Sequence, residues 1–331
     1  MSKNLIALLK VLISVGLAGI LLYLVFRNVE WVTFWERAKS VDYTWVIISI
    51  LLSIVAYIAR AYRWNILLEP LGYSLKTSRT TIAVLIGYLA NLALPRLGEI
   101  TRCGVLKRND NVSMPNALGS VVTERIIDVL TLFFLIIISL IVESDRLIQF
   151  MTGAYKDLNI PNYVWWIVAM VTLVGGILFI YFIKKQKQFK GKLSGLIRSF
   201  MEGVFSLKDI KRPLGFIVST VVLWVVYFLM SYIIVFSLPE TRHLGLGAGF
   251  MLLITGGIAL SIPVQSGFGT YHGMIAGMLL LYAIDETTGI FLATLLHTSQ
   301  IVAIAIFGSI ALVISFLMRR KSASKETNWQ K

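Results

Sequence analysis

The chain has 331 residues, of which 57% are hydrophobic and 15% are charged, and its mean hydropathy is +0.80. Soluble globular proteins carry about 25% charged residues, so this composition excludes a soluble globule and predicts a protein that crosses a membrane several times. The net charge of +14 gathers at the ends of apolar segments, which indicates membrane orientation and contact with anionic headgroups rather than a nucleic-acid partner.

The sequence lacks the common signatures of catalysis and metal binding. Its one cysteine, Cys103, excludes an internal disulfide and forms no metal-ligand spacing with the three histidines. No CxxC, HExxH, P-loop or GxGxxG motif occurs. We therefore predict no catalytic residue, no metal and no cofactor, and we expect that the protein is not an enzyme.

Six segments have the roughly 20 apolar residues that are needed to cross a hydrocarbon layer of about 30 Å. They are Leu5–Phe26, Trp45–Leu68, Pro115–Val142, Tyr163–Ile183, Leu214–Leu238 and Gly289–Met318. No small-residue cleavage site follows the first segment, so we expect a retained span rather than a signal peptide. Two amphipathic stretches, Val29 to Trp35 and Leu193 to Leu207, are expected to lie along the membrane surface.

Two further apolar segments are interrupted by proline. Thr80–Leu94 would form a helix of only about 22 Å, too short to cross comfortably, and it ends at Pro95. Leu246–Ile262 ends at Pro263 and is followed by a polar turn and a second apolar limb. Non-helical backbone within a membrane is tolerated only where protein or water satisfies it. We therefore predict two re-entrant helical hairpins.

The distribution of charge predicts the orientation. If both hairpins return to their side of entry, one face receives most of the basic residues, including nine between Lys184 and Arg212. Treating the hairpins as full crossings would put Lys107 and Arg108 opposite the other basic clusters, which fits less well. By the positive-inside rule, both termini are then cytoplasmic in a multi-pass protein of the inner (cytoplasmic) cell membrane.

The same layout divides one integral membrane domain, residues 1–322, into halves 1–145 and 160–320, with a cytoplasmic tail at 323–331. Each half contains two spans, a hairpin and a span, so that the second half is inverted. Leu92-Ala-Leu-Pro95 resembles Leu260-Ser-Ile-Pro263, although chance similarity between apolar segments is an alternative. We predict an all-α polytopic membrane protein with an inverted repeat, an architecture that recurs in transporters.

Charged residues interrupt the apolar pattern of the first half at candidate site positions. They are Arg96, Glu99 and Arg102 at the first hairpin tip, and Glu124, Arg125 and Asp128 in the next span. An ionised group at mid-membrane depth costs several kcal/mol or more unless it is paired or wetted. The arginines suit a phosphate. The alternative is structural: Glu99 pairs with Arg102, Arg125 pairs with Asp128, and a buried ion network locks the hairpin to the span.

The second tip offers a different set of candidates. Gly267 and Gly269 can turn the backbone and expose amides to an anion, or they can allow close packing. His272 and His297 could titrate near neutral pH, but a lone membrane histidine more often bonds a neighbouring helix. Gln300 lies one turn after His297.

Several residues are given supporting roles. Asn91 is expected to cap or bond the broken backbone, and Pro95, Gly98 and Pro263 are expected to break the helices. Arg60 and Arg63, near the cytoplasmic end of the second span, are expected to extend toward the headgroups, with direct lipid transfer as the alternative.

The run Asn91–Arg102, followed by Ser120–Asp128, resembles the lysylphosphatidylglycerol synthase/flippase transmembrane-region family. The shared pattern is roughly Asn, Leu-Pro, Arg, Gly-Glu and Arg, followed by Glu-Arg and Asp in the next span. Arg60 and Arg63-Trp64 fit the same family. The second half departs from the pattern, because the second tip ends in His272 where the family tends to carry glutamate. His297-Thr-Ser-Gln300 stands where relatives often have an arginine.

The resemblance implies the movement or handling of a phospholipid or polyprenyl-type lipid. No counterpart of the soluble aminoacyl-transfer domain is seen, so aminoacyl-lipid synthesis is not implied. We expect a lipid flippase whose partners are anionic or polyprenyl-type lipids, with self-association or a lipid synthase as further partners. The headgroup phosphate would meet Arg96, Arg102, Arg125 and the tip amides.

Two other functions stay open at this point. One is a membrane-embedded transferase that acts on lipid-linked substrates, with Glu124 or Asp128 as its base. The other is a noncatalytic protein that delivers lipid to a separate synthase.

Overall fold

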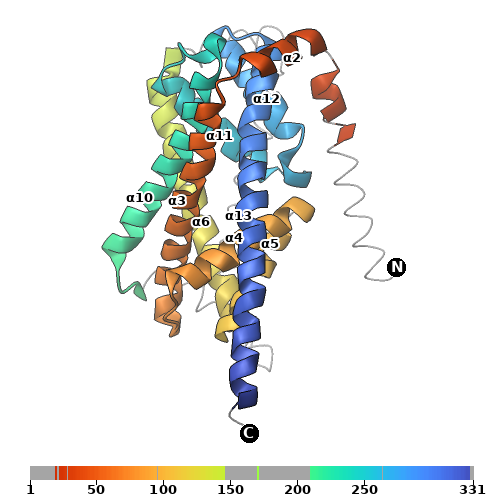
Figure 1. Cartoon of the computed structure of the whole chain (residues 1–331). Helices are drawn as coiled ribbons and strands as arrows, with labels where there is room; N and C mark the ends of the chain where they lie inside the picture. The colour runs from red at the N-terminus through yellow and green to blue at the C-terminus, as the bar shows by residue number, and fades with distance from the viewer. Residues whose placement is uncertain are drawn as a thin grey trace.

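The computed structural model describes residues 19–20, 22–27, 29–94, 96–145, 170, 209–262 and 264–328, with the side chains of 140 and 319–328 left out. Every regular element in these residues is a helix, which confirms the predicted all-α class for this part of the chain (Figure 1). Three predictions fall wholly or mostly outside the described residues: the spans Leu5–Phe26 and Tyr163–Ile183, and the surface stretch Leu193–Leu207.

Three described helical segments are long and apolar enough to cross a membrane, judged by length and composition alone. They are Tyr43–Leu71 (α3, Tyr43–Leu68, with η1, Glu69–Leu71), Pro213–Ser237 (α10, Pro213–Tyr232, with η4, Ile233–Ser237) and Glu286–Met318 of α13 (Glu286–Asn328). Each overlaps a predicted span. A fourth predicted span, Pro115–Val142, lies within the single helix α6, Met114–Val142.

Local sequence signals explain where these helices begin. α3 starts after Asp42, whose side chain accepts a hydrogen bond from the Thr44 amide at 3.1 Å and so satisfies a donor of the first turn. α6 and α10 each carry proline in the first turn, where the missing amide hydrogen costs no helical hydrogen bond.

The two interrupted segments form helical hairpins. The first consists of α4 (Thr77–Ala93) and α5 (Leu97–Asp110); the second consists of α11 (Leu246–Ser261), η6 (Gln265–Gly267), α12 (Thr270–Leu279) and η7 (Leu280–Tyr282). Pro95 and Pro263 themselves lie outside the described residues. Arg79, near the start of α4, forms an ion pair at 2.5 Å with Asp110 at the end of α5, so the chain doubles back at the break.

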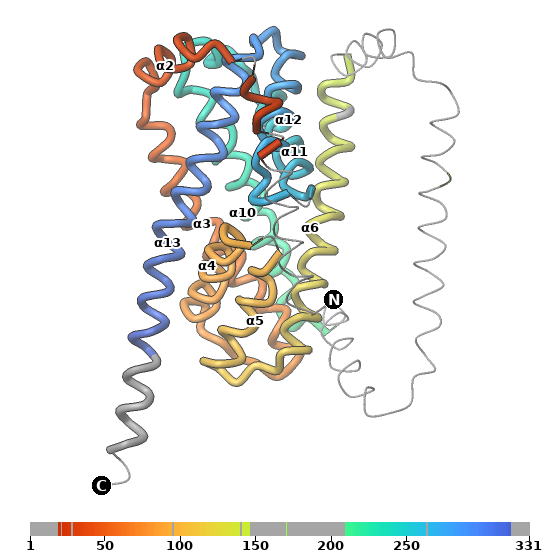
Figure 2. The backbone as a smooth tube through the Cα atoms, turned by 90° about the vertical axis from the view of Figure 1, so that its right-hand side faces the viewer, coloured from red at the N-terminus to blue at the C-terminus, as the bar shows by residue number. Residues whose placement is uncertain are grey.

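The hairpins occupy opposite halves of the molecule along its long axis. Figure 2 shows α4 and α5 in one half and α11 and α12 in the other, with α3, α6, α10 and α13 running beside them. This arrangement is compatible with the predicted inverted repeat, which stays a prediction, as does the entry of the hairpins into a membrane.

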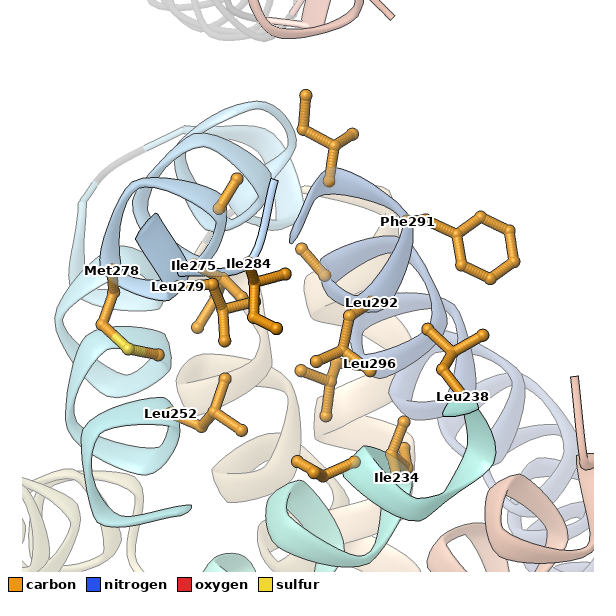
Figure 3. Close-up of a cluster of buried hydrophobic side chains, with 14 of the residues drawn as sticks. Ile234, Leu238, Leu252, Ile275, Met278, Leu279, Ile284, Phe291, Leu292 and Leu296 are labelled. Atoms are coloured by element: carbon orange, nitrogen blue, oxygen red, sulfur yellow. The ribbon is translucent and has the colours of Figure 1, made fainter. Parts of the chain in front are cut away.

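A buried apolar cluster holds the helices together in each half of the molecule. One unites α11, α12, η4 and the first part of α13, and includes Leu252, Ile275 and Leu292 (Figure 3). The other unites α3, α4, α5 and α6 and includes Trp64 and Leu106. The first hairpin is therefore packed against the helices that carry the charged residues.

The outward faces of the long helices are also apolar. Large exposed hydrophobic side chains include Ile47 and Leu51 of α3, Val129 and Phe133 of α6, Val221 and Val225 of α10, and Ile306 and Val313 of α13. An apolar surface of this extent is typical of contact with lipid.

α2, Trp31–Ser40, confirms a helix at the first predicted surface stretch. Trp31 and Trp35 are exposed, while Arg37 pairs with Asp285 at 3.3 Å and with Glu240 at 3.7 Å. These ion pairs fasten α2 to the loops at one end of the bundle. Its contact with a membrane surface stays a prediction.

Candidate functional site

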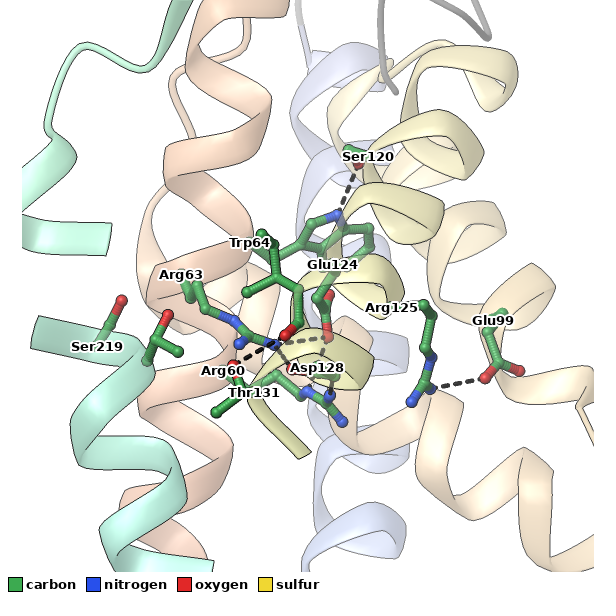
Figure 4. A network of polar contacts seen from close by, with 12 residues as sticks. Arg60, Arg63, Trp64, Glu99, Ser120, Glu124, Arg125, Asp128, Thr131 and Ser219 are labelled. Carbon is green, nitrogen blue, oxygen red and sulfur yellow. Dashed lines mark hydrogen bonds and ion pairs between the residues drawn. The ribbon is translucent and has the colours of Figure 1, made fainter. Parts of the chain in front are cut away.

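The charged residues of α3 and α6 meet in a buried network (Figure 4). Arg60 and Arg63 share one face of α3 because they are three residues apart, and Glu124 and Asp128 share one face of α6 because they are four apart. Asp128 accepts from Arg60 Nη2 at 2.5 Å and from Arg63 Nη2 at 2.6 Å. Arg60 Nε also lies 2.8 Å from Glu124 Oε1. The two faces are therefore complementary in charge and spacing.

Glu124 connects this network to the first hairpin. Its second oxygen, Oε2, accepts from Arg102 Nη1 of α5 at 3.0 Å. The Arg102 guanidinium lies 4.5 Å from the ring centroid of Trp64, whose indole donates to Ser120 Oγ at 2.9 Å. Glu124 and Arg63 have no exposed side-chain surface. The buried carboxylate thus joins three helices.

A more exposed ion pair lies beside this buried network. Arg125 Nη2 of α6 is 2.7 Å from Glu99 Oε1 of α5, and the two side chains are 45% and 25% exposed. The structural alternative named other partners, namely Glu99 with Arg102 and Arg125 with Asp128, and both pairings are wrong. An ion network that joins the hairpin to the span is nevertheless present. Its pairs connect α5 with α6, whereas the predicted pairs lay within one helix.

The prediction that Arg60 and Arg63 extend toward headgroups at the membrane surface is also wrong. Both are buried in the ion network, and Arg60 Nη1 also donates to Tyr88 Oη at 2.6 Å. Glu124 and Asp128 of α6 form charge-assisted hydrogen bonds with these arginines inside the bundle. The arginines therefore do not need to reach the headgroup region to find a partner. The signal was visible as an i,i+3 arginine pair and an i,i+4 carboxylate pair in neighbouring spans.

A pocket opens between α3, α4, α5 and α6 next to the network. It is narrow in this structure, because the enclosed space has room for about one water molecule. It is lined by Arg60, Val84, Gly87, Tyr88, Asn91, Gly98, Glu99, Arg102 and Arg125. Arg102 Nη2 and Glu99 Oε2 are buried and have no hydrogen-bond partner among the described residues. The pocket therefore holds both a donor and an acceptor with unused capacity.

The break in the first hairpin shapes one wall of this pocket. Asn91 Oδ1 accepts a hydrogen bond from the Gly98 amide at 2.6 Å, which confirms the expected role of Asn91 in bonding the broken backbone. Arg96 has a left-handed backbone with φ of 62° and precedes α5. It is exposed and lies outside the ion pairs described above. Gly98 allows the backbones of α4 and α5 to approach closely.

The charge of the site favours an anion. With all groups ionised, the four arginines Arg60, Arg63, Arg102 and Arg125 face the three carboxylates Glu99, Glu124 and Asp128. One positive charge is left unmatched. Arginine presents a planar fork of donors that matches a phosphate or carboxylate.

The second-tip candidates do not join this site. His272 and His297 are buried with ring centroids 5.1 Å apart, and Tyr271 stacks on His297 at 5.0 Å. His297 Nε2 lies 2.8 Å from the Ser266 carbonyl oxygen, as expected for a histidine that bonds a neighbouring segment. Gln300 is hydrogen-bonded to Tyr271. These residues form a separate aromatic and histidine cluster.

The glycines of the second tip fit the packing alternative better than an exposed anion site. Gly267 and Gly269 have φ of 73° and 81°, a backbone region that favours glycine. The Gly267 amide donates to the Val264 carbonyl at 3.1 Å, so it is already used. A Cβ at position 267 would lie 2.8 Å from Leu260 Cδ2.

The two helix breaks are in direct contact through Gln265. Its side-chain amide donates to the carbonyl oxygens of Leu92 and Ala93 at 2.9 and 3.0 Å. These carbonyls lie in the last turn of α4, where intrahelical partners run out. Sequence reasoning missed Gln265, and it also missed Tyr88 and Trp64 as partners of the arginines.

Comparisons with known proteins agree with the motifs of the first half. The family model described as "Lysylphosphatidylglycerol synthase TM region" matches residues 8–308. A protein from Haloferax volcanii, named glycosyltransferase AglD, is 34% identical over 80 residues. That match covers 24% of this chain and 13% of the relative, so most of the relative has no counterpart in the alignment. No solved structure matches the chain.

Proposed function

Because the chain belongs to the lysylphosphatidylglycerol synthase transmembrane-region family, we propose that it is a lipid flippase or flippase-like transporter. It moves the headgroup of a phospholipid or polyprenyl-type lipid through a polar pocket within the inner (cytoplasmic) cell membrane. Family membership and the apolar helices indicate a membrane protein with a lipid-related function. The position of the pocket next to the break in the first hairpin supports the more specific proposal of headgroup transport.

The single observation that carries it is the pocket beside the break between α4 and α5. Buried charge is costly in a membrane, and ion pairs alone would satisfy a purely structural network. Arg102 is 4% exposed, and its Nη2 lacks a partner among the described residues. Arg63 also has unpartnered nitrogens, but Arg102 lines the pocket and Arg63 does not. A headgroup phosphate would satisfy this donor and neutralise the unmatched positive charge.

In this mechanism the hairpins are re-entrant and approach from opposite leaflets. The polar headgroup occupies the pocket while its acyl or prenyl tails stay in the bilayer, against the apolar outer faces of the helices. Shielding the headgroup removes most of its desolvation cost. Rocking of the two halves about the contact of Gln265 with α4 would open the pocket to each leaflet in turn. Both termini are cytoplasmic in this arrangement.

Reconstituted protein should accelerate lipid movement across vesicles. We expect fluorescent anionic or prenyl lipids to become accessible to an impermeant quencher at least about tenfold faster than in protein-free vesicles. Arg125→Gln should lower the rate about tenfold or more, because a hydrogen bond to a charged group contributes about 1.5–3 kcal/mol. Arg212→Gln is the matched control, since Arg212 pairs with Glu69 at the end of the bundle. Protein-free rates for every lipid in the panel would contradict the proposal.

The relative named as a glycosyltransferase gives the transferase function a specific reason to be tested. In that case Glu124 or Asp128 would act as a base on a lipid-linked substrate. Both carboxylates form ion pairs with arginines, so a base role would require one of these pairs to open. Product formation by the purified protein from a labelled donor would decide for an enzyme. A stably co-purified synthase, without transport by the protein alone, would decide for lipid delivery.

A further inference from the structure

We propose that the Glu99 carboxylate is an internal substitute for a phosphate, held by Arg125 at the pocket, and that an anionic headgroup binds by displacing it. Glu99 then determines which lipids enter, because only a group that competes with a carboxylate for Arg125 can open the pair. The proposal rests on the proposed function for the source of the phosphate, namely a membrane lipid. The ion pairs of Glu124 and Asp128 then hold the helices together, while the neighbouring Arg125–Glu99 pair opens to admit the headgroup.

The first step of the argument is the difference in burial between these sets. Glu124 has 0% of its side chain exposed, whereas Arg125, the next residue, is 45% exposed and Glu99 is 25% exposed. Figure 4 shows the Arg125–Glu99 pair to one side of the central network. The pair can open toward solvent or lipid headgroups while Glu124 and Asp128 keep their arginines.

The second step is the pair of unused polar atoms. Glu99 Oε2 is buried without a hydrogen-bond partner among the described residues, and so is Arg102 Nη2. A buried polar atom without a partner costs about 1–3 kcal/mol. Moving Glu99 into water would hydrate its second oxygen. A phosphate with several acceptor oxygens could then bind Arg125 and Arg102 together, which one carboxylate oxygen does not do here.

The third step is the charge balance. When Glu99 leaves, the four arginines face only Glu124 and Asp128, so two positive charges are unmatched. An anionic phosphodiester or a phosphate monoester reduces this excess. A zwitterionic headgroup brings its own cation close to the arginines and is disfavoured by repulsion. The pocket should therefore prefer lipids whose headgroup has a net negative charge.

The test measures equilibrium binding to the full chain in detergent, by calorimetry at low salt. The probes are dihexanoyl phosphatidylglycerol, dihexanoyl phosphatidylcholine and inorganic phosphate. We expect Glu99→Gln to bind the phosphatidylglycerol about tenfold more tightly than the unmodified protein, which corresponds to about 1.4 kcal/mol. Arg125→Gln should bind it about tenfold more weakly, and phosphatidylcholine should bind weakly to all forms. Glu99→Asp keeps the competing charge and should stay within about threefold of the unmodified protein.

Glu69→Gln is the matched control, because it removes one carboxylate from the Arg212 pair far from the pocket, and it should change nothing. Unchanged or weaker lipid binding by a folded Glu99→Gln protein would overturn the proposal. The same gain for inorganic phosphate but not for lipid would overturn the lipid as the source. Binding needs no transport, so transport without a Glu99 effect refutes this inference alone. A Glu99 effect without transport refutes only the flippase function.

Discussion

The Glu124→Gln variant should lose about 3–5 kcal/mol of unfolding free energy, the cost of removing one partner from a buried ion pair. Glu124 lies between Arg60, Arg63 and Arg102, and its side chain has no exposed surface. Glutamine keeps the shape but leaves these three guanidinium groups without their central counter-ion. Denaturant titration in detergent micelles, followed by circular dichroism, measures the loss.

Glu69→Gln is again the control for a lost carboxylate. Its pair with Arg212 is partly exposed, with 20% and 47% of the side chains accessible, and such pairs contribute about 0–1 kcal/mol. A Glu124 variant that unfolds at the same denaturant concentration as the Glu69 variant would show that the network is not buried as described.

Replacing Gly98 with alanine should separate α4 from α5 and destabilise the protein by about 1–3 kcal/mol, the usual cost of overpacking a close contact. An added Cβ would lie 2.2 Å from the Gly87 carbonyl oxygen and 2.6 Å from the Asn91 side chain. A backbone carbonyl cannot move without its helix. Arg102 would shift with α5, so lipid binding should fall together with stability, as measured by the melting temperature and by calorimetry.

Gly104 provides a control within the same helix. A Cβ at Gly104 would have no neighbour within 4 Å, so Gly104→Ala should stabilise α5 by about 0.5–1 kcal/mol through helix propensity. If Gly98→Ala instead matched Gly104→Ala in stability, the close crossing of α4 and α5 would be incorrect.

The long helices and the breaks could be predicted from the sequence because both follow from local composition. The bounds of the predicted spans Trp45–Leu68 and Leu214–Leu238 lie within three residues of the corresponding helical segments. The hairpins followed from apolar segments too short to cross and ended by proline. The predicted tail at 323–331 stays a prediction, since α13 continues to Asn328 without showing where the membrane ends. The two spans outside the described residues stay predictions.

Five of the seven charged residues of the site could be predicted from the sequence, but their pairing could not. Glu99, Arg102, Glu124, Arg125 and Asp128 were all identified, because charge within an apolar segment is conspicuous. Their partners depend on how α5 lies against α6, and sequence spacing describes only contacts within one helix. That limitation produced the wrong local pairs and the wrong position for Arg60 and Arg63.

The second tip shows the same limit in another form. Gly267, Gly269 and His272 were candidates for the headgroup site, but His272 packs with the rings of Phe26, Phe268 and His297. Gln265 makes the contact between the two breaks, through carbonyls of α4 that have no helical partner. A glutamine in a polar turn gives no sequence signal of which distant backbone it will bind.

The depth of α5 in the bilayer tests the central claim most directly, since a lipid site requires the break and its charges to lie within the membrane. One spin label would be placed at Ile100 and another at Lys107, which are both exposed on α5, in a Cys103→Ala background. In reconstituted vesicles we expect the label at 100 to collide more with oxygen than with a water-soluble nickel chelate. The label at 107 should show the reverse. Equal access of the nickel chelate to both positions would place the break in bulk water and contradict the account.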